Sequence, residues 1–309
     1  MKSVYLLILK AAVSVGSLYL VSRSIAWGAV VNVLKGAQFP YLIAALALFW
    51  MAQIFSSLRC AYIAHALGGR LNLSTSIRAH FVGLWFNQVL PTGLGGDFIK
   101  MAILQKPLGL SVAVRSAILD RLSGFMFLLL ALAVTLPFYV KLFPTQPELV
   151  SALGAIAFGG VSAILLGALF VNGQSKLVAR NPVLLGIIQL FCDVSKFRKG
   201  SALWGQLWTS AIVHFNGIIT YALLGFALGI NEELLTFILI VPIIFLIALI
   251  PISFAGWGLR EAGAVWLFGL IGINSGSALA LSIFFGLLLF VAGLPGLFMI
   301  WISRSSSHN

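Results

Sequence analysis

Hydrophobic residues occur along this chain in long runs, separated by short connections that hold most of the charged residues. A helix needs about 20 predominantly apolar residues to cross the hydrocarbon core of a bilayer. The runs therefore predict an all-α, polytopic membrane protein with about six full spans. The expected spans cover residues 4–22, 39–67, 122–140, 149–171, 203–228 and 278–302.

Two further apolar segments are interrupted by glycine-rich breaks, LPTGLGGDFIK from Leu90 and IPISFAGWGLRE from Ile250. Each break contains a proline, a glycine five residues later and a basic residue nine residues later. These residues are Pro91, Gly96 and Lys100 in the first break, and Pro251, Gly256 and Arg260 in the second. The apolar stretch before each break is too short to cross about 30 Å of hydrocarbon. Broken backbone inside a membrane is tolerated only against protein or water, so we expect two re-entrant hairpins.

Composition supports a membrane protein and excludes an ordinary soluble domain. Hydrophobic residues make up 61% of the 309 residues and charged residues only 8%, whereas a soluble surface needs about three times as much charge. We therefore expect residues 1–309 to form a single integral membrane domain, with any chemistry in or at the membrane.

The distribution of positive charge predicts the orientation. The 19 Lys and Arg residues lie mainly in the connections, and connections rich in these residues stay in the cytoplasm. The connection of residues 172–200 is the most basic, and the turn of residues 231–233 carries only acid. We expect an inner-membrane protein with both termini in the cytoplasm. The net charge of +12 does not predict nucleic-acid binding, because no basic helix or arm is present.

The two hairpins suggest an internal duplication. Pro91 and Pro251 are 160 residues apart, just over half the chain, and the orientation count makes the hairpins enter from opposite sides. This arrangement predicts an inverted-topology repeat with halves 1–146 and 147–309. Transporters with such repeats place broken helices and substrate sites near the membrane midplane.

The breaks are the first candidates for a binding site. A helix that starts after a glycine-rich turn points its backbone N–H groups and positive dipole end at any ligand there, which suits a phosphate or carboxylate. Lys100 and Arg260 lie about one turn further on and would supply full positive charge. The glycines that would let backbone approach a ligand are Gly93, Gly95, Gly96, Gly256 and Gly258. The hypothesis is one anionic headgroup held between the two breaks.

Polar and aromatic neighbours of the breaks have two interpretations each. Asp97 is either a first-turn acid that accepts from backbone N–H groups or a proton carrier. Glu261 either neutralises Arg260 or carries a proton. Trp257 either contacts an acyl chain of the lipid or packs against other side chains of the protein. Asn87 either bonds the broken backbone or lines a cavity. At the start of a predicted span, Asp120 and Arg121 are expected to form an interfacial ion pair or to join the site.

Three stretches in order resemble motifs of the lysylphosphatidylglycerol synthase transmembrane region family, also called flippase-like or uncharacterised family 0104 membrane proteins. They are LPTGLGGDFIKMAIL, DRLSGFMFLL and FAGWGLREAGAVWLF. The resemblance extends over essentially the whole chain. It implies a module similar to the one that moves aminoacylated phosphatidylglycerol between leaflets. The motif positions correspond to Pro91, Gly96, Asp97, Lys100, Asp120, Arg121, Gly256, Gly258, Arg260 and Glu261. Lys100 occupies a position where the family more often has arginine. An arginine guanidinium can form two hydrogen bonds to one phosphate.

These features predict a lipid translocase for an anionic phospholipid or a polyprenyl-phosphate-type lipid. Two alternatives remain: a non-catalytic membrane partner or anchor for a lipid-modifying or glycan-assembling enzyme, and a secondary transporter for a small anion. No nucleophile and base pair, cofactor motif or metal-ligand spacing occurs in the sequence, so we expect neither an enzyme nor a cofactor. The soluble aminoacyl-transferase domain that makes such lipids is not part of this chain, so we expect no lipid synthesis by it.

Overall fold

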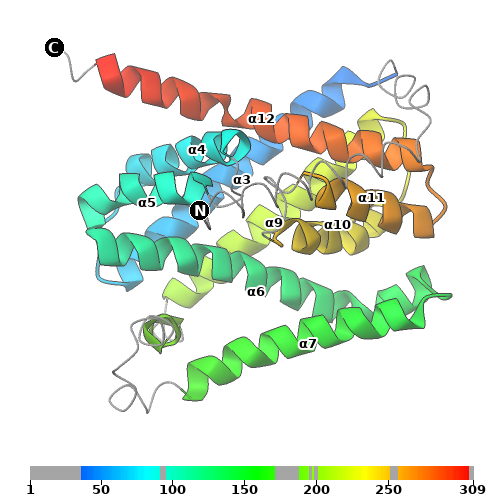
Figure 1. The fold of residues 1–309 in the computed structure, drawn as a ribbon, viewed down its shortest axis with the longest axis horizontal. Helices are drawn as coiled ribbons and strands as arrows, with labels where there is room; N and C mark the ends of the chain where they lie inside the picture. Colours follow the sequence, from blue (N-terminus) through cyan, green and yellow to red (C-terminus); the bar gives the residue numbers. More distant parts are fainter. Residues whose placement is uncertain are drawn as a thin grey trace, which may run out of the picture. The chain divides into compact units, whose positions relative to one another are not determined.

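A computed structural model describes residues 36–90, 95–170, 188–194, 197, 201–250 and 257–305. All regular structure in these residues is helical (Figure 1). The helices are α3 (Phe39–Ala66), α4 (Leu73–Val89), α5 (Gly95–Leu108), α6 (Leu110–Leu142), α7 (Pro147–Phe170), α9 (Ser201–Ala227), α10 (Leu234–Ala248), α11 (Leu259–Leu270) and α12 (Ser275–Ser305). The prediction of an all-α polytopic membrane protein is confirmed.

Five of the described helices are long and apolar enough to cross a membrane. They are α3, α6, α7, α9 and α12, and they coincide with five of the six predicted spans. The sixth, residues 4–22, lies outside the described residues. Segment ends follow local chemistry. Gly109 has a φ of 75° between α5 and α6, a left-handed value that glycine adopts readily. α7 starts at Pro147 and carries Glu148 in its first turn, a typical helix start.

The helices next to the two breaks are short. The lengths are 17 residues for α4, 14 for α5, 15 for α10 and 12 for α11. A full span needs about 20 residues. In each pair the two helices contact each other, and α4 and α5 run antiparallel, because Asn87 meets Gly96 whereas the earlier His80 meets the later Lys100. The contacts are close, as the space around two glycines shows. A Cβ atom added to Gly263 of α11 would lie 3.0 Å from Ile247 of α10. A Cβ atom added to Gly83 of α4 would lie 3.0 Å from the carbonyl oxygen of Gly96 in α5. These short helices lie on either side of the two breaks, and the re-entrant hairpins stay a prediction.

The chain forms two compact units that are interleaved along the sequence. The first unit contains residues 1–53, 78–100 and 215–309, and the second contains residues 54–77 and 101–214. Both glycine-rich breaks belong to the first unit. These units are not the halves 1–146 and 147–309, so the inverted repeat and the single membrane domain remain predictions.

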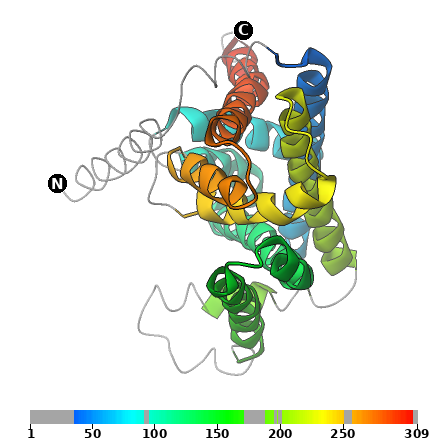
Figure 2. The same cartoon turned by 90° about the vertical axis from the view of Figure 1, so that its right-hand side faces the viewer.

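In the first unit, α11 packs against both α10 and α12 (Figure 2). Their core is a cluster of aromatic rings in which Tyr221 contacts Phe245, Phe268 and Phe285, with ring centroids 5.0–6.3 Å apart. In the second unit, α6 and α7 run side by side (Figure 1), and Ile63, Leu119 and Phe197 form a buried cluster. Aromatic packing of this kind fixes the helices that carry the polar residues described next.

Candidate functional site

The first break joins α4 to α5 through a close helix contact. The backbone N–H of Gly96 donates to Asn87 Oδ1 over 2.8 Å. A Cβ atom on Gly96 would overlap the Gly83 carbonyl oxygen and the Asn87 side chain. Gly96 is therefore needed for helix packing, and Asn87 bonds the backbone as one of its two interpretations predicted. Pro91 and Gly93 lie outside the described residues.

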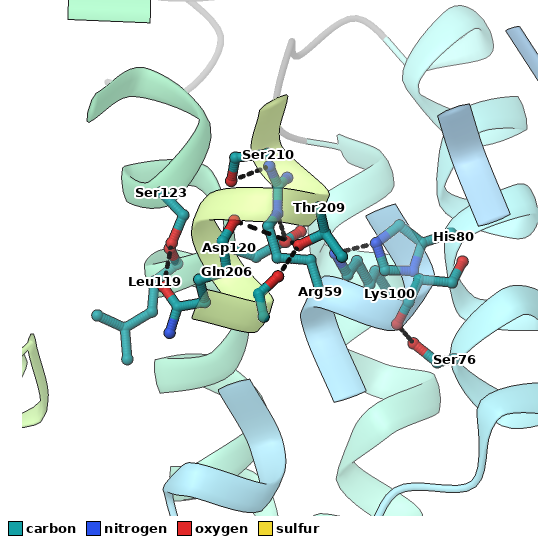
Figure 3. Close-up of polar contacts among 12 residues, drawn as sticks. Arg59, Ser76, His80, Lys100, Leu119, Asp120, Ser123, Gln206, Thr209 and Ser210 are labelled. Atoms are coloured by element: carbon teal, nitrogen blue, oxygen red, sulfur yellow. Dashed lines mark hydrogen bonds and ion pairs between the residues drawn. The ribbon is translucent and has the colours of Figure 1, made fainter. Parts of the chain in front are cut away.

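Lys100 lies in the second turn of α5, where it meets a histidine from the middle of α4. Its Nζ atom lies 2.7 Å from Nε2 of His80, and both residues are buried. Figure 3 shows the two side chains pointing toward each other. Lysine is a donor only, so the neutral ring nitrogen accepts. Gly95 is buried at the start of α5, and Asp97 is half-buried in its first turn.

The second break ends at α11 with a backbone-capping carboxylate. Gly258, which precedes the helix, has a φ of 89°, where other residues are strained. Its N–H donates to Oε2 of Glu261 over 2.6 Å. Glu261 thus satisfies a backbone donor at the helix start, as a first-turn acid commonly does. Gly256 lies outside the described residues.

Arg260 is held by contacts on several sides. Its Nη2 and Nε atoms donate to Oε1 of Glu261 over 2.5 and 3.0 Å, and Nε also lies 3.3 Å from Ser282 Oγ of α12. The guanidinium lies 4.9 Å from the ring centre of Trp257 and 5.7 Å from that of Phe285. The side chains of Arg260 and Glu261 are 3% and 0% exposed. The interpretation in which Glu261 neutralises Arg260 is the one that the geometry matches.

One face of α12 connects the two helix pairs. Gly286 lies against the Arg260 guanidinium and the Trp257 ring, whereas Gly293 and Gly296 lie against the α4 backbone at Trp85 and Phe81. Ser282, Gly286, Gly293 and Gly296 follow one another at three-, four- or seven-residue intervals, so they share one side of the helix. Small residues on one face let helices in a membrane approach closely. α12 therefore serves as the common support of both breaks.

The order of these contacts locates the ends of the helices. Gly293 of α12 contacts Trp85 of α4, whereas Gly296, which comes later in α12, contacts Phe81, which comes earlier in α4. The two helices therefore run antiparallel. With a rise of 1.5 Å per residue, the end of α4 at Val89 lies about one helical turn from the level of Gly286. The first break thus starts within about one helical turn, along the α12 axis, of the level at which Gly286 meets Arg260. Lys100, next to His80, lies close to the level of Gly296, about 15 Å further along α12.

Asp120 and Arg121 lie on α6 in the second unit. Arg59 Nε donates to Asp120 Oδ1 over 2.7 Å, and Arg59 Nη1 donates to Ser210 Oγ over 3.1 Å (Figure 3). The Arg59 and Asp120 side chains are only 6% and 7% exposed. Arg121 is exposed. Asp120 is therefore part of a buried ion pair that holds α3 and α6 together.

The sequence profile described as "Lysylphosphatidylglycerol synthase TM region" matches residues 7–296. The chain belongs to this family. Neither a curated protein nor a solved structure matches it significantly. Family membership and the five apolar helices make this member of the lysylphosphatidylglycerol synthase TM region family an integral membrane protein.

Sequence reasoning about this family member missed His80 and Arg59. His80 and Lys100 are each ten residues from Leu90, and residues equidistant from a hairpin turn meet across it, so the spacing could have indicated their contact. Arg59 and Asp120 are 61 positions apart, and no local spacing indicates such a pair. Among the described residues, no group of three His, Cys, Asp or Glu side chains could hold a metal ion.

Proposed function

We propose that this protein moves an anionic lipid, a phospholipid or a polyprenyl-phosphate-type lipid, between the leaflets of the cell's inner membrane. The observation that carries the proposal is one face of α12 that contacts both the Arg260 guanidinium, at Gly286, and the α4 backbone, at Gly293 and Gly296. Family membership supports the same role. Broken helices whose N-termini meet in the membrane are a recurring way to bind anionic groups in transporters.

In this proposal Lys100 and Arg260 bind the lipid headgroup one after the other. Gly286, which meets Arg260, and Gly296, which meets α4 next to His80, are about 15 Å apart along α12, so we propose that one phosphate does not contact both cations at once. A headgroup would therefore meet them one after the other while its tails stay in lipid. At Arg260 the phosphate takes the place of Glu261, and the carboxylate keeps its bond to the Gly258 N–H. Exchange of one anion for another avoids leaving a buried guanidinium unpaired.

A second function has one specific observation in its favour. Arg260 is paired with Glu261 inside the protein, as expected of a membrane partner or anchor subunit for a lipid-modifying or glycan-assembling enzyme. Such a subunit needs its breaks only for packing and does not move lipid. In the part of the chain that the structure describes, no feature specifically favours a small-anion transporter. Neither role requires catalysis by this chain.

Lipid translocation is measured in liposomes that contain the purified protein. Fluorescent phosphatidylglycerol and fluorescent polyprenyl phosphate are placed in both leaflets, and a membrane-impermeant quencher is added outside. With the wild type we expect quenching to continue beyond the outer-leaflet share. Lys100→Gln, and Arg260→Met combined with Glu261→Gln, should each slow this phase about tenfold or more, because a charge-assisted contact contributes about 1.5–3 kcal/mol.

The matched control is Arg70→Gln, which removes a positive charge from an exposed position in the connection after α3. This variant should translocate lipid at the wild-type rate. Quenching that stops at the outer-leaflet share for every lipid, in the wild type as in protein-free liposomes, would contradict translocation and favour the anchor role.

The proposed topology has the two hairpins entering from opposite sides and both termini in the cytoplasm. It is tested by single cysteines in a background that lacks Cys60 and Cys192. Cysteines at Asn231 and Ser275 should react in intact cells with a reagent that cannot cross the membrane, whereas one at Arg70 should react only after the cells are opened. Reaction of Arg70→Cys in intact cells would contradict the inverted repeat.

A further inference from the structure

The second unit contains a cavity of about 270 Å³ between α6, α7 and α9. Most of its lining is apolar and includes Leu122, Met126, Leu130, Ile164 and Leu207. All three helices are apolar enough to cross a membrane. Apolar cavities of this size range stay dry and accept apolar ligands, and known small-molecule pockets start near 300 Å³. The cavity therefore suits a single hydrocarbon chain.

A polar group at this cavity is activated by the buried ion pair. Ser210 lines the cavity, and its oxygen accepts from the Arg59 guanidinium over 3.1 Å (Figure 3). Asp120 accepts from Nε of the same guanidinium and so fixes its position. Among the described residues, Ser210 has no acceptor for its own hydroxyl hydrogen. A hydroxyl that already accepts from a cation is a strong donor.

A second polar group lies one helical turn away on α9. Gln206 also lines the cavity. The one hydroxyl hydrogen of Ser123 is shared between Gln206 Oε1 and the Leu119 carbonyl oxygen, each 2.8 Å from Ser123 Oγ. The Nε2 atom of Gln206 is buried and has no hydrogen-bond partner in the described part of the chain. Residues four apart on a helix are neighbours on one face. Gln206 and Ser210 therefore present two donors to the same side of an otherwise apolar cavity, and buried donors without acceptors are costly.

We propose that this cavity binds one fatty acyl chain of an ester-linked lipid, whose carbonyl oxygen accepts from Ser210 and Gln206. An ester carbonyl is an acceptor with no hydrogen to donate, and a hydrocarbon chain follows it directly, so it matches two donors beside an apolar space. Isoprenoid chains have no carbonyl at this position. The site does not depend on the proposed translocation, because it would hold a bound structural lipid equally well.

The test uses the full-length protein in detergent micelles and phosphatidylglycerol with a photoreactive diazirine in one acyl chain. After illumination, mass spectrometry of peptides should find adducts on cavity residues such as Met126 and Leu130. Leu130→Trp, which fills the cavity, should reduce these adducts at least about fivefold. The matched control is Val134→Trp, one turn further along α6, where the side chain is 75% exposed. The control should leave cavity labelling unchanged.

A competition experiment on the wild type tests the carbonyl contact and does not depend on any variant folding. Unlabelled ester-linked phosphatidylglycerol should compete with the probe about five- to tenfold better than its ether-linked analogue, which lacks the carbonyl oxygens. Equal competition by the ether lipid would overturn the carbonyl contact, and stronger competition by polyprenyl phosphate would overturn the choice of an acyl chain. Adducts confined to lipid-exposed positions, or unchanged in Leu130→Trp, would overturn the site itself.

Discussion

Replacement of Arg260 by alanine is expected to destabilise the protein by about 3–5 kcal/mol, the usual cost of leaving one partner of a buried ion pair uncompensated. Glu261 is 0% exposed and would lose both bonds from the guanidinium, keeping those to the Gly258 N–H and Ser282. The stacking of the guanidinium on Trp257 would also be lost. The measurement is the free energy of unfolding by denaturant in mixed micelles.

The double variant Arg260→Met with Glu261→Gln separates the charge from the packing. It removes both charges and keeps two side chains of similar volume, so it should be substantially more stable than Arg260→Ala. Arg70→Ala, at an exposed arginine, is the control and should change the unfolding free energy by less than about 0.5 kcal/mol. Arg260→Ala with wild-type stability would contradict the buried ion pair described here.

Gly296→Ala is expected to have the second large effect, a loss of about 3 kcal/mol, near the upper end of the usual cost of overpacking. The added Cβ atom would overlap the carbonyl oxygen and carbon of Phe81 and lie close to Val82 N. These are backbone atoms of α4, so relief requires the two helices to separate. The change is measured as the apparent unfolding temperature in detergent, together with the lipid translocation rate.

Two other glycines provide a graded control. A Cβ atom on Gly293 would lie 3.1 Å from Trp85 Cα, whereas one on Gly269 of α11 meets no atom within 4 Å. Gly293→Ala should therefore be less harmful than Gly296→Ala, and Gly269→Ala should be neutral or stabilising because alanine favours helix. Equal effects at all three positions would show that α12 does not support α4 through this face.

The spans and the breaks could be predicted from sequence because they depend on local properties. Runs of apolar residues fix where a helix is long enough to cross a membrane, and five of the predicted spans coincide with α3, α6, α7, α9 and α12. Proline and clustered glycines fix where a helix stops, and α4 and α10 end beside Leu90 and Ile250. Asn87 is also predictable as a hydrogen-bond partner of the broken backbone, since it is a polar residue directly before the break.

The tertiary contacts could not be predicted, because helices in lipid are apolar on every side and show no stripe that marks the packed face. Arg59 and Asp120 lie on helices far apart in sequence, and their pairing depends on how those helices cross. The α12 face is a partial exception. The small residues Ser282, Gly286, Gly293 and Gly296 follow a helical spacing that is typical of close helix contacts in membranes, and this signal could have assigned α12 as the support of both breaks.

Lipid translocation by the wild-type protein is the most direct test of the proposed function. In liposomes with fluorescent phosphatidylglycerol or polyprenyl phosphate in both leaflets, the account predicts that the protein exposes inner-leaflet lipid to an external quencher faster than occurs in protein-free liposomes. It also predicts slower exposure when Arg260→Met and Glu261→Gln are combined. Identical rates with and without protein, for both anionic lipids and with correctly folded protein, would contradict it.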